Sequence, residues 1–492
     1  MPVTKLRVVS CQNKSAGASR PQRPSPRPLA PSPYRKAITL IEMLVALAVT
    51  LLMMGAVVSI FGWIGNSVSD SRASIEIAER LRAARNRLQL DLQSATAQMD
   101  PPRRPESDEG YLEYIEGPRR DSDFDSSHKH NILGDNDDIL MLTIRSRGEP
   151  FVGKGAGVAI ESQSAEVVWY MYPSRIIQTS DSTQPIQLCK LCRRQLLVYP
   201  SASAATTPWA TFFSVNDVSA RVDSAGTGWV GNTLGDLTKP ENRYAHIATP
   251  GGPAGGYPFR VDLPIIDPPP SGAALYPFPV GSGRTGEDVI LDNVLAFNVQ
   301  AYDPGAPIYP DPPTGTMTGT ITPSDAKYVA QYGSAGAAPI SYGAYVDLGY
   351  AYTSASGLIS HTVGAGAPNP LFADRPTDKH RRVVLFTQDP VPSMLSYDSS
   401  SKQAQAYTYD TFSLHYENNG LNEDGDADTD EGTNGLDDGT PTGNGAVDDP
   451  AEYETQPPYS ARLRGLQIKI RVYEPDSRQV REVTVVQDFL PQ

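Results

Sequence analysis

A continuous apolar segment near the N-terminus constrains this chain more than any other feature. Residues 38–65 read ITLIEMLVALAVTLLMMGAVVSIFGWIG and hold one charged side chain, Glu42. A helix of that length extends about 42 Å, while the hydrocarbon core of a bilayer is roughly 30 Å thick. The sequence therefore predicts a membrane-spanning helix over 38–65.

The residues that precede this segment are basic. Residues 1–37 hold eight Lys or Arg and no Asp or Glu, although the chain of 492 residues carries a net charge of −14. Because basic flanks stay on the cytoplasmic side of a membrane, we expect residues 1–37 in the cytoplasm and the C-terminal bulk in the periplasm. Two alternatives are a secretory signal peptide, whose apolar region is usually much shorter, and a plain single-pass anchor.

Glu42 favours a more specialised helix than a plain anchor. A carboxylate near the end of an apolar membrane helix costs roughly a few kcal/mol on insertion scales and usually has a partner. Cleavage between Ala37 and Ile38 would create an α-amino group four residues before Glu42. An amine and a carboxylate at that offset can pair within one helix or between staggered neighbours. This layout predicts a helix that packs beside copies of itself or its relatives.

The segment 35–45, which reads RKAITLIEMLV, resembles the type IV prepilin signal. In that family a membrane-embedded prepilin peptidase removes a basic leader just before an apolar run of this kind. The resemblance implies cleavage after Ala37, N-methylation of Ile38, and an assembly role for Glu42 as the fifth residue of the mature chain. It also implies an inner-membrane location and pilin or pseudopilin partners bound through this helix. The family usually has Gly at the position of Ala37.

A second helical pattern follows in residues 66–100. Apolar side chains recur at steps of three and four, which is one face of a 3.6-residue helix, and the prolines at 101 and 102 end the pattern. We therefore expect one helix from about 38 to 99, with a membrane half and an amphipathic half that packs on a globular head. The apolar positions are Ile77, Leu81, Ala84, Leu88, Leu92, Ala95 and Met99.

Residues 101–492 predict a β-rich periplasmic head with long loop insertions. Apolar runs rich in β-branched and aromatic residues predict strands, and the Pro, Gly, Ser and Asp-rich segments 101–136, 201–285 and 303–380 predict long loops. One long helix followed by strands, without alternating βαβ units, indicates an α+β fold with an antiparallel sheet. The predicted strands are 139–144, 166–172, 195–199, 294–302, 382–386, 411–416, 466–473 and 481–486, and the last two form a C-terminal hairpin.

The head pattern resembles the J-subunit family of minor pseudopilins in type II secretion systems. The resemblance rests on a strand that begins at 137, the EVVWY run at 166–170, and the closing VTVV at 483–486. It implies a structural subunit at the tip of a periplasmic pseudopilus, which supports protein secretion and faces secreted cargo or the outer-membrane channel. A W-type minor type IV pilin is the main alternative, because the long insertions depart from the compact J subunit. A single-pass anchored periplasmic binding protein is a third interpretation.

Residues 420–450 form an acidic loop with ten Asp or Glu and no Lys or Arg. Asp424, Asp426, Asp428 and Asp430 alternate along it, and hard oxygen ligands at this spacing in a Gly-rich loop suit Ca²⁺. The twelfth position counted from Asp424 is Gly435 and not Glu, so the loop is not an EF-hand. A calcium site and a solvated acidic loop both fit this pattern.

Cysteine and histidine usage predicts no catalytic centre. Cys189 and Cys192 form a C-x-x-C pair, and no second pair is present to complete a zinc site, so we expect a local disulfide in an oxidising periplasm. The six histidines match neither a nucleophile elbow nor an H-E-x-x-H helix. The acidic net charge argues against nucleic acid as a partner. We therefore expect a protein that is not an enzyme.

Overall fold

The fold is that of a computed structural model of the whole chain. It describes residues 38–117, 134–136, 138–177, 186–205, 209–244, 284, 286–313, 315–325, 327–328, 338–353, 357–358, 368–373, 382–384, 404–422, 428–437, 443–475 and 477–489. The chain divides into two units, Met1–Ser67 and Val68–Gln492. A continuous helix, α1 (Leu40–Gln93), begins in the first unit and ends in the second.

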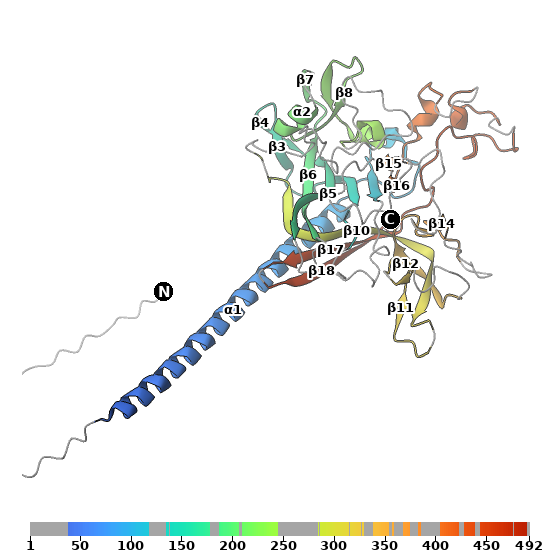
Figure 1. Cartoon of the computed structure of the whole chain (residues 1–492). Coiled ribbons are helices and arrows are strands. Elements are labelled where there is room, and N and C mark those ends of the chain that lie inside the picture. Colours follow the sequence, from blue (N-terminus) through green and yellow to red (C-terminus); the bar gives the residue numbers. More distant parts are fainter. Residues whose placement is uncertain are drawn as a thin grey trace, which may run out of the picture. The chain divides into compact units, whose positions relative to one another are not determined.

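The second unit is built on a large sheet (Figure 1). Its main path runs, in spatial order, through β15 (Arg382–Val384), β16 (Ala404–Asp410), β1 (Leu112–Glu116), β2 (Ile139–Arg145), β5 (Ser164–Ile177), β6 (Ile186–Val198), β10 (Val289–Asp311), β17 (Gly465–Glu474) and β18 (Gln479–Asp488). Neighbours on this path pair antiparallel, and β17 and β18 form the predicted C-terminal hairpin. A long N-terminal helix with a mostly β head confirms the α+β class in outline.

Smaller elements branch from the main path. The strands are β7 (Ser203–Ala205), β8 (Val218–Val222), β9 (Gly228–Gly231), β11 (Gly319–Ile321), β12 (Ser341–Val346) and the two-stranded pairs β3 (Phe151–Gly155) with β4 (Val158–Ser162) and β13 (Tyr352–Thr353) with β14 (Gly357–Leu358). The helices are α2 (Trp209–Val215), α3 (Leu234–Thr238) and the 3-10 turns η1 (Pro105–Ser107), η3 (Pro240–Asn242), η5 (Leu414–Asn418) and η6 (Glu431–Thr433). Strand β8 pairs parallel with β6, which departs from the antiparallel pattern.

The C-terminal half of α1 packs on one face of the sheet. The five apolar positions of its predicted stripe that lie within the helix are at most 5% exposed and belong to the largest hydrophobic cluster. The stripe predicted from the 3.6-residue period is therefore confirmed from Ile77 to Leu92. Figure 1 shows β17 and β18 beside this part of the helix, and Arg481 of β18 donates a hydrogen bond to the Ser74 hydroxyl.

The opposite face of the sheet is covered by α2, α3 and the β8–β9 ladder. Along β2, Leu140 and Leu142 enter the helix-side cluster, whereas Ile139 and Met141 enter the other cluster. Side chains alternate across a strand, so a strand buried on both faces reads as a continuous apolar run. This explains the uninterrupted ILMLTI sequence that marked β2.

Three sequence predictions about the fold are wrong. Helix α1 ends at Gln93 and not near 99, because the chain turns to pair with β2 through Thr96 N to Thr143 O (3.0 Å) and Arg145 N to Ser94 O (2.9 Å). The strand predicted at 411–416 is instead a turn into η5, since Phe412 adopts a positive φ of 42°. The segments 201–285 and 303–380, predicted as loops, contain α2, α3 and seven strands (β7–β9 and β11–β14) among their described residues, and segment 101–136 contains β1.

Candidate functional site: the N-terminal helix

The helix start is fixed by a reciprocal pair of hydrogen bonds between Thr39 and Glu42. The Glu42 amide donates to Thr39 Oγ1 (3.3 Å), and Glu42 Oε2 accepts from the Thr39 amide (2.9 Å) and hydroxyl (3.0 Å). This is a capping box, and the sequence T-x-x-E before an apolar run encodes it. Both bonds from Thr39 reach Oε2, and within the described residues Oε1 accepts no hydrogen bond.

The membrane half of α1 is apolar and exposed on all sides. Every residue from Ile38 to Arg72 is exposed, including the many large apolar side chains between positions 38 and 64. The helix is long enough to cross a membrane, and its most apolar 18-residue window has a mean hydropathy of 2.6. An apolar surface of this extent is stable only in lipid or against other apolar helices.

The amphipathic half is tied to the sheet by a buried charge that sequence analysis missed. Asp91 is 2% exposed. Its Oδ2 accepts from Trp169 Nε1 (2.9 Å) and Arg193 Nε (2.6 Å), and its Oδ1 accepts from Arg193 Nη2 (2.9 Å). This two-pronged contact aligns the guanidinium with the carboxylate and fixes the register of α1 against β5 and β6.

A second arginine, Arg87 of α1, lies beside the contact between Asp91 and Arg193. Arg87 Nε lies 3.7 Å from Asp91 Oδ1, and Arg87 Nη2 donates to Gln195 Oε1 (3.1 Å), which also accepts from Arg193 Nη1. Partial burial, followed by the charge of Arg193, lowers the pKa of Arg87. In the sequence, Asp91 is only an acidic residue next to Leu92 of the apolar stripe. This pattern is too common in amphipathic helices to predict that the acid is buried.

The predicted processing residues lie at the edge of the described region. Ala37 is outside the described residues, and Ile38 is 71% exposed just before the helix. Glu42 stands in the first turn of α1, where an acid is also favoured by the positive end of the helix dipole. Cleavage after Ala37 and methylation of Ile38 stay predictions.

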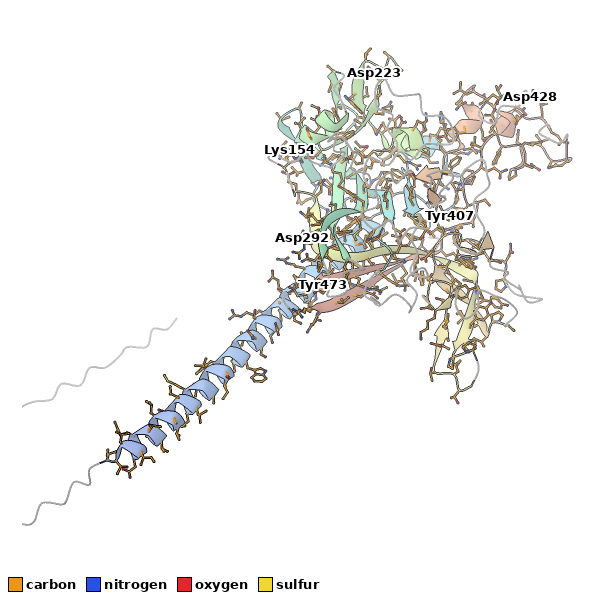
Figure 2. The ribbon with its side chains drawn as sticks, in the orientation of Figure 1. Lys154, Asp223, Asp292, Tyr407, Asp428 and Tyr473 are labelled. Carbon is orange, nitrogen blue, oxygen red and sulfur yellow. The ribbon has the colours of Figure 1, made fainter. Side chains whose placement is uncertain are left out.

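The acidic loop is described only in part. Asp424 and Asp426 lie outside the described residues. Asp428 is exposed, and Figure 2 shows it at the side of the second unit that carries the acidic loop. Asp430 adopts a positive φ of 55°, and its Oδ1 accepts from the amides of Asn419 (2.8 Å) and Gly420 (3.0 Å). The calcium site predicted for this loop stays a prediction.

The predicted disulfide between Cys189 and Cys192 is wrong. Both side chains are buried in β6 and carry no disulfide. Because residues three apart on a strand point to opposite faces, Cys189 lies in the helix-side cluster and Cys192 in the cluster on the other face. The sheet separates the two thiols, and burial raises the pKa of Cys192 to about 12.

Comparison with known proteins agrees with the character of the helix start. Residues 33–58 match the prokaryotic N-terminal methylation motif. No curated protein and no solved structure matches the chain. The motif indicates a type IV pilin-like or pseudopilin protein, which implies a structural and not an enzymatic role. It covers the predicted cleavage position, the capping box and the first part of the apolar helix.

Proposed function

We propose that this chain is a minor pseudopilin of a type II secretion system, of the J type. In this role it is a structural subunit at the tip of the pseudopilus and supports protein secretion. The observation that carries the proposal is the capping-box acid at the start of an exposed apolar helix, within the matched methylation motif. The β-rich head with its C-terminal hairpin supports the J-type assignment.

Processing precedes assembly in this proposal. Residues 1–37 act as a cytoplasmic leader that a prepilin peptidase removes, and Ile38 then carries the N-methylated amine. Before assembly, the helix of residues 38–65 spans the inner membrane and the head lies in the periplasm. Its apolar surface, exposed in the isolated chain, is then covered by neighbouring pilin-like helices.

Glu42 supplies the electrostatic contact between subunits. Its Oε2 already caps the helix through Thr39, while its Oε1 is available to accept from a neighbour's terminal amine. A carboxylate in an apolar environment requires such a partner. One side chain can therefore define the helix start and pair with the next subunit at the same time.

The size of the head supports a position at the tip. A unit as long as Val68–Gln492 has a radius of gyration of about 22 Å, whereas packed helices lie about 8–10 Å apart. A head several times wider than the spacing of its helix favours the end of a filament, where it meets fewer neighbours. Secreted cargo or the outer-membrane channel is the partner that a tip subunit would meet.

The two alternatives differ in what they require. A W-type minor type IV pilin uses the same helix in another filament, so it is distinguished by the pilin-like proteins that co-purify with the chain. An anchored binding protein requires a ligand cavity, and a pocket of about 260 Å³ lined by Ile160, Phe212 and Trp229 is the observation that favours it. It predicts an uncleaved N-terminus, whereas both pilin interpretations predict a start at methylated Ile38.

Three variants test the role of Glu42 in the full chain. Glu42→Gln keeps a side chain that can complete the capping box but removes the charge, whereas Thr39→Ala removes the cap and keeps the charge. We expect Glu42→Gln and Glu42→Ala to prevent cross-linking to other pilin-like subunits in the membrane, and Thr39→Ala to retain it. N-terminal sequencing of each extracted protein controls for processing. Normal cross-linking of Glu42→Gln, with loss in Thr39→Ala, would show that the acid acts only as a cap.

A further inference from the structure

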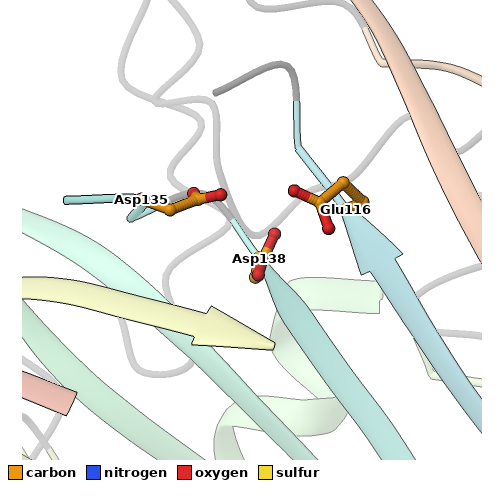
Figure 3. A group of neighbouring side chains, drawn as sticks. All are labelled: Glu116, Asp135 and Asp138. Atoms are coloured by element: carbon orange, nitrogen blue, oxygen red, sulfur yellow. The ribbon is translucent and has the colours of Figure 1, made fainter. Parts of the chain in front are cut away.

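Three carboxylates that sequence analysis did not single out converge inside the head. One oxygen from each of Glu116, Asp135 and Asp138 lies within 4.8 Å of the other two. Figure 3 shows the three side chains directed toward one another from the end of β1 and the segment that leads into β2. All three residues are 0% exposed. Two oxygens on opposite sides of one Ca²⁺ are separated by about 4.6–5.2 Å, so the spacing suits a single ion.

Backbone amides from distant segments hold two of these carboxylates in place. Asp138 Oδ1 accepts from the Gly117 amide (3.2 Å), and Asp138 Oδ2 accepts from the Val299 amide (2.6 Å). Glu116 Oε2 accepts from the Leu348 amide (3.3 Å). Each carboxylate oxygen has more than one lone pair, so these bonds orient the group and leave capacity for a cation. The cluster thus joins β1, the start of β2, β10 and the residues after β12.

The hydroxyl of Tyr114 is a second and independent observation at this place. Tyr114 is 0% exposed and lies two residues before Glu116 on β1, so both side chains point to the same face. Its cross-strand partner is Leu140, two residues after Asp138. Within the described residues the Tyr114 hydroxyl has no hydrogen-bond partner.

Two buried neutral oxygens lie on β10, the strand whose backbone amides bind the segment 135–138. The amide oxygens of Asn298 and Gln300 are buried and accept no hydrogen bond within the described residues. Their amide nitrogens both donate to Asp347 Oδ1, at 3.5 Å and 2.8 Å. Asn298 lies between two residues whose amides bind the segment 135–138. Buried acceptors that lack a donor are the groups that a bound cation or its water would satisfy.

We propose that Glu116, Asp135 and Asp138 form a Ca²⁺ site in the core of the head, separate from the acidic loop. Carboxylate and amide oxygens are hard ligands, which select Ca²⁺ or Mg²⁺ over softer metals. Mg²⁺ usually keeps several waters, whereas Ca²⁺ accepts six to eight oxygens in a flexible protein cage, so a fully buried site favours Ca²⁺. The ion would lock together strands that lie far apart in the sequence.

Calcium titration of the full chain in detergent tests the site. We expect the EDTA-treated protein to bind Ca²⁺ in calorimetry at least about tenfold more tightly than Mg²⁺, and to unfold at a higher temperature once loaded. Asp138→Asn should weaken this binding by at least about tenfold, because Ca²⁺ affinity follows the number of charged ligands. The matched control is Asp428→Asn in the acidic loop, which should leave this site's affinity unchanged.

Further variants keep the test decisive. If Asp138→Asn fails to fold, Glu116→Gln has nearly the same volume and can still accept from the Leu348 amide. Tyr114→Phe removes only a hydroxyl that has no hydrogen-bond partner among the described residues, so it should fold normally and weaken Ca²⁺ binding by a smaller factor. The proposal is overturned if the wild-type protein shows neither binding heat nor a temperature shift with Ca²⁺. It is equally overturned if binding persists in all three core variants or is lost only in Asp428→Asn.

Discussion

Removing the carboxylate of Asp91 should detach the amphipathic half of α1 from the sheet. The Asp91→Ala variant loses three hydrogen bonds, to Trp169 Nε1 and to two nitrogens of Arg193, and leaves a guanidinium that is 6% exposed without its main counter-ion. Breaking a buried ion pair on one side costs about 3–5 kcal/mol. Amide exchange in residues 77–93 should therefore accelerate by roughly one hundred- to several thousand-fold, as read by hydrogen–deuterium exchange mass spectrometry.

Two controls distinguish the effect of losing the buried Asp91 charge from a general destabilisation of α1. Glu76→Ala removes an exposed pair with Arg80 on the same helix, so it should change exchange by less than about threefold. The double variant Asp91→Leu with Arg193→Met replaces both charges by apolar groups and should recover most of the protection. The reasoning is refuted if Asp91→Ala exchanges like Glu76→Ala, or if the double variant is no better protected than the single one.

Two further predictions follow from buried titratable groups. Burial raises the pKa of Glu417 from its ordinary value near 4.5 to about 7. Between these two pH values the folded state holds a proton that the unfolded state has lost, so the free energy of unfolding falls as pH rises from about 4.5 to about 7. Amide hydrogen exchange around η5, corrected for its intrinsic pH dependence, should be faster at pH 8 than at pH 5. The Glu417→Gln variant should abolish this difference. Slower corrected exchange at pH 8 than at pH 5 would contradict the raised pKa of Glu417. Cys189 and Cys192 should resist alkylation until the protein is denatured, and the intact mass should be unchanged by reduction, whereas a mass increase on reduction would reveal a disulfide after all.

The elements that the sequence predicted are those whose signal is local and periodic. The steps of three and four from Ile77 to Leu92 identify the buried face of α1, because burial follows the helical repeat directly. The C-terminal hairpin follows from two short β-rich runs separated by a turn. In each case the residues that decide the structure lie within a few positions of one another.

The elements that the sequence did not predict depend on partners far along the chain. Arg243 is fully buried because Glu113 and Asp410, each at 2.8 Å, meet it from two different strands. Asp91 is buried for a similar reason, since Arg193 lies about a hundred residues away. Strand register decides such pairs, and no local pattern encodes it. The cysteine prediction failed likewise, because a C-x-x-C spacing permits a disulfide in a turn but separates the thiols in a strand.

For Glu42, the free energy gained from the capping box is smaller than the cost of burying its carboxylate in lipid. This difference predicts which step must come first, processing or assembly. A capping box contributes about 0.5–2 kcal/mol, whereas an unneutralised carboxylate that reaches the centre of the hydrocarbon region costs about 2.5–3.5 kcal/mol on insertion scales. The bonds to Thr39 alone therefore do not offset burial of the charge. A second partner at Oε1 is needed, and a terminal amine at Ile38 would exist only after the proposed cleavage that follows Ala37. Cleavage would thus create the group that makes burial of Glu42 between subunits favourable, so an unprocessed chain should remain outside the filament even when its helix is fully formed.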